Sequence, residues 1–107
     1  MTIAVSTLRQ LEGLTVVGAT LIHDYAQLAF THQVGLSIYN EWSIHPETLT
    51  FEQLVGKTVT SVKGERDSIV FHFLDDTKLV IDMHPEAYRG PEALQLNREG
   101  EPPVVWN

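Results

Sequence analysis

Three side chains in the second half of the chain have the types and spacing to hold a metal ion: His72, Asp82 and His84. Asp82 and His84 are two positions apart, so a strand carries both on one face. A hairpin with His72 opposite them would complete a set of three zinc ligands, with water as the fourth. However, the chain lacks the HExxH and paired Cys/His spacings of zinc sites. We therefore expect an exposed polar face without a metal. The alternative is a β-domain that binds a metal ion or small ligand, or a metal-dependent enzyme, using the face formed by His72, Asp82 and His84.

Other residues of catalytic type have simpler structural explanations. His23-Asp24 has the composition of an acid–base pair, and Ser37 or Ser43 could supply a nucleophile. The sequence contains no Gly-x-Ser-x-Gly elbow, and Asp75-Asp76 lacks the alternating carboxylates of a calcium loop. The absence of cysteine excludes thiolate chemistry. We predict a non-catalytic protein that uses no cofactor.

The charge of the chain favours a basic binding partner. Fourteen acidic and seven basic residues give a net charge of −7, which disfavours contact with nucleic acid or an anionic membrane. Four carboxylates on one predicted hairpin and its exit are expected to face the partner: Asp75, Asp76, Asp82 and Glu86. Aromatic residues of the kind that dominate binding hot spots are expected in loops nearby: Tyr39, Trp42 and Tyr88. Packing in the core or at a sheet edge is the alternative for Tyr39 and Trp42.

The size and composition of the chain indicate one globular domain. A length of 107 residues suits a single core, and 43% hydrophobic residues is ordinary for a folded protein. No stretch approaches the roughly 20 apolar residues of a membrane helix. The first residues lack the basic start and apolar run of a signal peptide. We therefore expect a cytoplasmic protein that does not enter membranes.

Hydrophobic alternation and turn residues predict a mainly β, antiparallel fold. Strands are predicted at residues 14–21, 26–31, 35–39, 58–63, 68–73 and 78–83. Short helical turns are predicted at residues 6–13 and 50–54, and the C-terminal segment 93–106 is expected to form a hairpin. The connection 40–56 is expected to contain no strand, because His45-Pro46 interrupts it.

The two groups of strands resemble each other when the sequence is shifted by 43 positions. Identical residues then meet at seven positions, among them Gly13 with Gly56, Phe30 with Phe73 and Ile38 with Ile81. We infer two similar three-stranded meanders, residues 13–40 and 56–83, that form a sandwich or a partly open barrel. The side chains predicted to build its core are Val16, Leu28, Phe30, Leu36, Ile38, Phe71, Phe73, Leu79 and Ile81.

The succession of these segments resembles small immunity proteins of bacterial contact-dependent growth-inhibition and related polymorphic toxin systems. The segments that carry the resemblance are residues 36–42, 54–59, 71–79, 88–96 and 104–106. The resemblance implies a non-catalytic protein that binds and blocks a cognate toxin domain, often a nuclease. A basic nuclease would also fit the acidic charge, because carboxylates steer association with a cationic surface.

Overall fold

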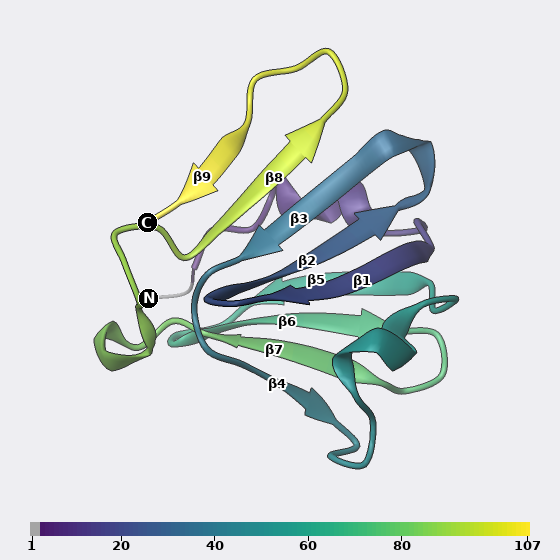
Figure 1. Cartoon of the computed structure of the whole chain (residues 1–107), viewed down its shortest axis with the longest axis horizontal. Coiled ribbons are helices and arrows are strands. Elements are labelled where there is room, and N and C mark those ends of the chain that lie inside the picture. The colour runs from purple at the N-terminus through teal and green to yellow at the C-terminus, as the bar shows by residue number, and fades with distance from the viewer. Residues whose placement is uncertain (1–2) are drawn as a thin grey trace.

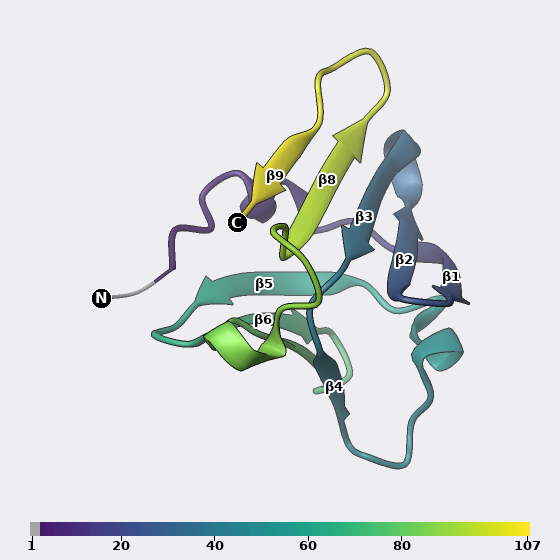
Figure 2. The ribbon, with the colours of Figure 1, turned by 60° about the vertical axis from the view of Figure 1, so that its left-hand side comes forward.

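The computed structural model describes residues 3–107, and this part of the chain folds into two antiparallel β-sheets over one core (Figure 1). The five-stranded sheet has the order β1 (Val16–Ile22), β2 (Tyr25–Phe30), β3 (Val34–Ile38), β8 (Leu94–Arg98) and β9 (Val104–Trp106). The four-stranded sheet has the order β4 (Trp42–His45), β7 (Lys78–Asp82), β6 (Ser68–Phe73) and β5 (Val59–Gly64). Viewed from another side, the strands of the two sheets cross at a steep angle (Figure 2).

Short 3-10 turns are the only helical segments among residues 3–107: η1 (Leu8–Leu11), η2 (Thr31–Gln33), η3 (Phe51–Leu54) and η4 (Pro85–Ala87). None of them is long and apolar enough to cross a membrane. The predicted mainly β, antiparallel class is confirmed, and each of the six predicted strands is present with small shifts at its ends. The predicted hairpin near the C-terminus is also present, as β8 paired with β9.

The two meanders share the same hydrogen-bonding register at an offset of 43 residues. Val16 pairs with Phe30 as Val59 pairs with Phe73, and a β-bulge follows Val16 and Val59 at the same point. The preceding turns η1 and η3 are also equivalent, and each leads to a glycine with positive φ, Gly13 at +89° and Gly56 at +93°. The repeat therefore extends beyond the strands into the turns before them.

The strand after each meander pairs with the opposite sheet. β4 follows β3 in the chain but pairs with β7, while β8 follows β7 and pairs with β3. The prediction that the connection 40–56 contains no strand is therefore wrong. Residues 42–45 form β4, and Pro46 ends this strand without preventing it. The exchange ties the two repeats together, because each repeat completes the sheet of the other.

The core lies between the two sheets and is closed by η1 and η3. All nine predicted core residues are buried, with exposed fractions of 3% or less. Leu8 and Leu11 of η1, and Phe51 and Leu54 of η3, are buried at the rim of the same cluster. Burial of these apolar side chains is the main force that holds the sheets together.

Candidate functional site

The four carboxylates predicted to form one acidic surface lie at opposite ends of the four-stranded sheet. Asp75 and Asp76 are in the turn between β6 and β7, next to the pair His72–Lys78. Asp82 ends β7 opposite Ser68, and Glu86 follows it in η4. Four residues of strand separate Lys78 from Asp82, which is about 13 Å. The four carboxylates therefore form two groups, with Asp75 and Asp76 in one neighbourhood and Asp82 and Glu86 in another.

Asp75 has a structural role in its turn. Its carboxylate forms an ion pair with Lys57 and accepts a hydrogen bond from the Thr77 backbone N–H at 3.2 Å. The hydrogen bond from Lys57, followed by those from Thr77, lowers the pKa of Asp75 to about 2. Thr77 is itself buried. Asp75 therefore fixes the turn, while its side chain stays 52% exposed.

His84 joins two carboxylates at the opposite end of the sheet. Its Nδ1 lies 2.7 Å from Asp82 Oδ1, and its Nε2 lies 3.3 Å from Asp67 Oδ2. The hydrogen bond with Asp82 raises the pKa of His84, and the charges of Asp67, Asp82 and Glu86 act in the same direction. Both ring nitrogens are thus engaged, and the imidazole connects the β5–β6 turn to the end of β7.

His72 does not join Asp82 and His84 as the metal hypothesis required. It pairs with Lys78, four residues from Asp82 along the sheet. Burial lowers the pKa of His72, and the charges of Lys63 and Lys78 lower it further. No group of three or more His, Asp and Glu side chains within residues 3–107 is arranged to hold a metal ion. The antiparallel register places His72 and His84 at opposite ends of the hairpin.

The other residues of catalytic type are also dispersed. His23 and Asp24 form the two-residue turn between the paired residues Ile22 and Tyr25. Ser37 lies on the outer side of β3, where Gln27 Nε2 is 3.4 Å from its hydroxyl. Ser43 pairs with Val80 on β4. The register therefore keeps these serines apart from the His23-Asp24 turn.

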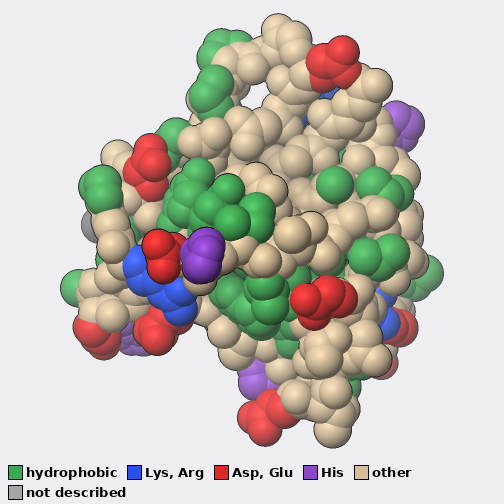
Figure 3. Space-filling model, in the orientation of Figure 1, with side chains coloured by type: hydrophobic (Ala, Val, Ile, Leu, Met, Phe, Trp, Pro, Cys, Tyr) green, Lys and Arg blue, Asp and Glu red, His purple; other side chains and the backbone are tan. Residues whose placement is uncertain are grey.

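Carboxylates gather at the end of the molecule where β3 and β7 finish and the β1–β2 and β5–β6 turns lie. We call this region the acidic end, and its carboxylates are Asp24, Glu41, Glu65, Asp67, Asp82, Glu86 and Glu92. Contacts link its parts: the Asp82 backbone N–H donates to Glu41 O at 2.9 Å, and Arg89 Nη1 is 3.3 Å from Asp24 O. Figure 3 shows acidic side chains beside basic ones and histidine over the β1–β2 turn and η4.

A cleft opens on both sides of Arg89 within the acidic end. One part, of about 300 Å³, has Leu21, Trp42 and Glu41 in its lining. The other, of about 170 Å³, has Tyr25 and Tyr39 in its lining. Asp24, Tyr25 and Arg89 border both parts. Among residues 3–107 no carboxylate lies within 4.0 Å of the Arg89 guanidinium. The cleft thus combines apolar walls, a carboxylate rim and a cation free to contact another molecule.

The structure places the predicted aromatic residues in two different roles. The Tyr39 ring lies 5.6 Å from that of Tyr25, and both tyrosines are half-buried at the cleft. Trp42 belongs to β4 and not to a loop, and its ring packs 4.9 Å from that of Phe51. Tyr88 follows η4 and is partly buried against the core. Trp42 and Tyr88 are therefore packing residues first, and Trp42 also borders the cleft.

The Arg89 cleft forms where the two repeats differ. In the second repeat, Gly64 is covered by the N-terminal segment, and a Cβ there would lie 1.8 Å from Ile3 O. The equivalent residue of the first repeat is Leu21, which is 51% exposed and borders the cleft. The link from β7 to β8 is also longer than that from β3 to β4. Leu94 follows Ile81 by 13 positions, whereas Trp42 follows Ile38 by 4. This longer link supplies Arg89.

Asn40 anchors the floor of this region. It is 1% exposed, and its side-chain N–H donates to Asp82 O at 2.9 Å. Its Oδ1 is buried without a hydrogen-bond partner among the described residues. Asn40 also borders the larger part of the cleft. Sequence reasoning missed that Asn40 and Arg89 lie at one site, because only the pairing of distant segments brings them together.

Comparison of the chain with protein-family models, with curated protein sequences and with solved structures gave no match.

Proposed function

We propose that this protein acts by binding a basic protein partner at its acidic end, and that it neutralises a toxin domain in the manner of an immunity protein. The partner fitting this proposal best is a nuclease-type toxin domain, whose cationic substrate site would face the carboxylates. No chemical step is assigned to the protein.

The gathering of carboxylates at the acidic end is the observation that carries the proposal. Seven carboxylates lie there against two arginines, Arg66 and Arg89. The chain as a whole has a net charge of −7. Such a field accelerates encounter with a cationic surface and orients the two proteins before contact. Carboxylates can also occupy the positions that phosphates take in a nuclease.

The Arg89 cleft also supports binding of a protein partner at the acidic end, because it offers a place for a side chain of that partner. Tyr and Arg are enriched in the energetic centres of protein interfaces, where they fill pockets and exclude water. Tyr25, Tyr39 and Arg89 supply these residue types, and Leu21 adds an exposed apolar surface. Carboxylates of the rim, such as Glu41, would then contribute mainly to the association rate.

Protection and capture test the proposal together. The tagged chain is used to capture binding partners from cells of its native host, and the captured protein is then expressed with and without this chain. We expect a basic protein that inhibits growth alone and is tolerated when the two are co-expressed. If no basic protein is captured, or if the captured protein inhibits growth equally with and without this chain, the proposal is wrong.

A further inference from the structure

The outer face of the five-stranded sheet carries no charged side chain between its turns. The cross-strand register assigns eleven residues of β1, β2, β3, β8 and β9 to this face, and Tyr39, directly after β3, continues it. They are Gly18, Thr20, Ile22, Tyr25, Gln27, Ala29, Gly35, Ser37, Tyr39, Gln95, Asn97 and Val105. In a chain with 21 charged residues, so wide a neutral surface is unusual. Depletion of charge is the main compositional mark of the centre of an interface.

The equivalent face of the four-stranded sheet shows that the repeat itself does not require neutrality. Lys63 occupies the position equivalent to Thr20, and His72 the position equivalent to Ala29. Lys78 and Asp82 also lie on that face. The absence of charged side chains is therefore a property of the five-stranded sheet alone, although the two repeats share the same strand register.

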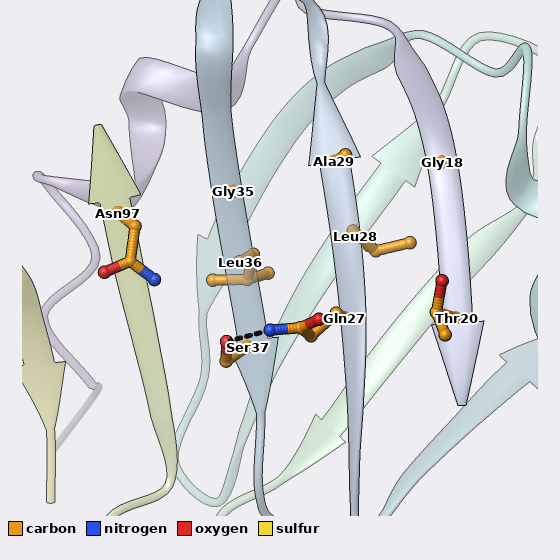
Figure 4. A pocket seen from close by; sticks show the side chains of 9 residues that line it. All are labelled: Gly18, Thr20, Gln27, Leu28, Ala29, Gly35, Leu36, Ser37 and Asn97. Atoms are coloured by element: carbon orange, nitrogen blue, oxygen red, sulfur yellow. Dashed lines mark hydrogen bonds between the residues drawn. The ribbon is translucent and has the colours of Figure 1, made fainter. Parts of the chain in front are cut away.

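The neutral face has a hollow and a ridge. Figure 4 shows Asn97, Gly35, Ala29 and Gly18 in one row across four strands, and these small residues help to enclose a hollow of about 220 Å³. The next row, with Ser37, Gln27 and Thr20, borders the same hollow. The row beyond consists of the large side chains Tyr39, Tyr25 and Ile22. The same surface thus carries a row of small residues, where another backbone could approach closely, and a row of large side chains that project from it.

We propose that this face binds a second copy of the same chain to form a twofold symmetric dimer. An isologous interface requires a surface that complements itself. The tyrosine row lies four residues, or about 13 Å, from the glycine row, with Gln27 midway between Tyr25 and Ala29. A twofold axis along the Gln27 row places the tyrosines of each copy over the hollow of the other. The two sheets then pack face to face, about 10 Å apart.

The net charge of the chain favours a second copy as the molecule that binds this charge-free face. Two copies of a chain with net charge −7 repel each other, and contact through a charge-free face avoids adding close like-charge pairs to that repulsion. Five strands about 4.8 Å apart and about 18 Å long present about 430 Å² per copy. Two copies together would bury about 860 Å², which is below the roughly 1,200 Å² of stable specific interfaces, so the dimer is expected to be weak and reversible.

Analytical ultracentrifugation over micromolar to millimolar concentration tests the dimer. We expect the mass to rise towards that of a dimer, and added salt to strengthen association by screening the repulsion between copies. This salt dependence is opposite to that of a basic partner, so failure of one proposal is distinguishable from failure of the other.

Two variants and one control locate the interface. Gly35→Val fills the hollow, and its Cβ would meet only Leu28 O at 3.8 Å, so the monomer should fold normally. Gln27→Glu brings two new charges together near the twofold axis. Each should weaken dimerisation tenfold or more. Gln33→Glu adds the same charge in the exposed β2–β3 turn and should leave the dimer unchanged.

A chain that stays monomeric at millimolar concentration in high salt would overturn the proposal. A dimer that tolerates both Gly35→Val and Gln27→Glu would overturn it as well, because it would use another surface. If the chain is monomeric and Gly35→Val instead abolishes capture of the basic partner, the neutral face belongs to that interface and not to a dimer.

Discussion

The hydroxyls of Thr15 and Thr58 are 2.8 Å apart, and these two residues are exchanged by the approximate twofold symmetry of the repeat. They also form an isolated antiparallel bridge between the sheets. Around them the backbone bonds occur in symmetric pairs: Gly13 donates to Val59 O and Gly56 to Val16 O, both at 2.8 Å. In addition to the exchanged strands, the two repeats therefore meet at a symmetric contact with the threonine pair at its centre.

This contact predicts a coupled effect on stability. Thr15→Val and Thr58→Val should each reduce the free energy of unfolding by about 1 kcal/mol, because each leaves one part-buried hydroxyl without its partner. The double variant should cost less than the sum, since both hydroxyls are then gone. Urea denaturation of the four proteins measures the coupling. Strict additivity would mean that the pair contributes nothing specific.

The buried aromatic residues predict equal contributions from the two repeats. Phe30 and Phe73 are equivalent and are 2% and 3% exposed. Replacing either by Ala should cost about 3–5 kcal/mol, because the cavity adds to the lost burial. Leu74→Ala serves as the control in denaturant melts and should change stability by less than about 0.5 kcal/mol, because Leu74 is 75% exposed. A loss below about 1 kcal/mol for Phe73→Ala would contradict the assigned core.

Much of this architecture could be predicted from the sequence, because strand alternation and the 43-residue repeat can be recognised from residue types alone. Phe71 and Leu79, for example, were placed correctly on the core face, where they pair. The strand β4 was missed because its partner β7 lies more than 30 positions away, and no local pattern reveals such an exchange. The Arg89 cleft was missed for the same reason, since Arg89 and Asp24 meet across 65 positions.

The carboxylates of the predicted surface separate into two groups for a different physical reason. Neighbours in sequence lie far apart once a strand intervenes, so Asp75 and Asp82 occupy opposite ends of β7. Conversely, Asp67 and Asp82 are distant in sequence but share His84. Charged residues that are close in sequence along a hairpin are therefore a poor guide to which side chains lie together. Their positions on the paired strands are a better one.

His84 predicts a specific dependence of stability on pH. Its pKa is raised above 6.5 in the folded state by Asp82 and Asp67. The stabilisation is therefore fully present below pH 6.5 and is lost as the pH rises through the raised pKa. The destabilisation caused by His84→Gln should accordingly be larger below pH 6.5 than above the folded pKa. NMR titration should show His84 above 6.5 and His72 below it, and Asp82→Asn should lower only the value for His84. An unshifted His84 would contradict the bridge.

Asp75 predicts the opposite pH dependence. Its pKa is lowered from 3.8 to about 2, so its contribution is present above pH 3.8 and is lost as the pH falls through about 2. Asp75→Asn should destabilise the protein at neutral pH and make no difference in strong acid. Asp76→Asn is the matched control, because Asp76 has a φ of +67° that Asn also adopts readily. Equal effects of the two variants at neutral pH would contradict the structural role of Asp75.

The dissociation constant of the captured basic partner, measured for charge-reversed variants, tests binding at the acidic end most directly. Glu41→Lys changes an exposed residue of the acidic end, and Glu47→Lys makes the same change beyond the far end of β4. Glu41→Lys should weaken binding about tenfold or more, Glu47→Lys should have little effect, and the affinity of the unmodified protein should fall with added salt. Equal effects of the two variants, or an affinity that does not change with salt, would contradict binding through the acidic end.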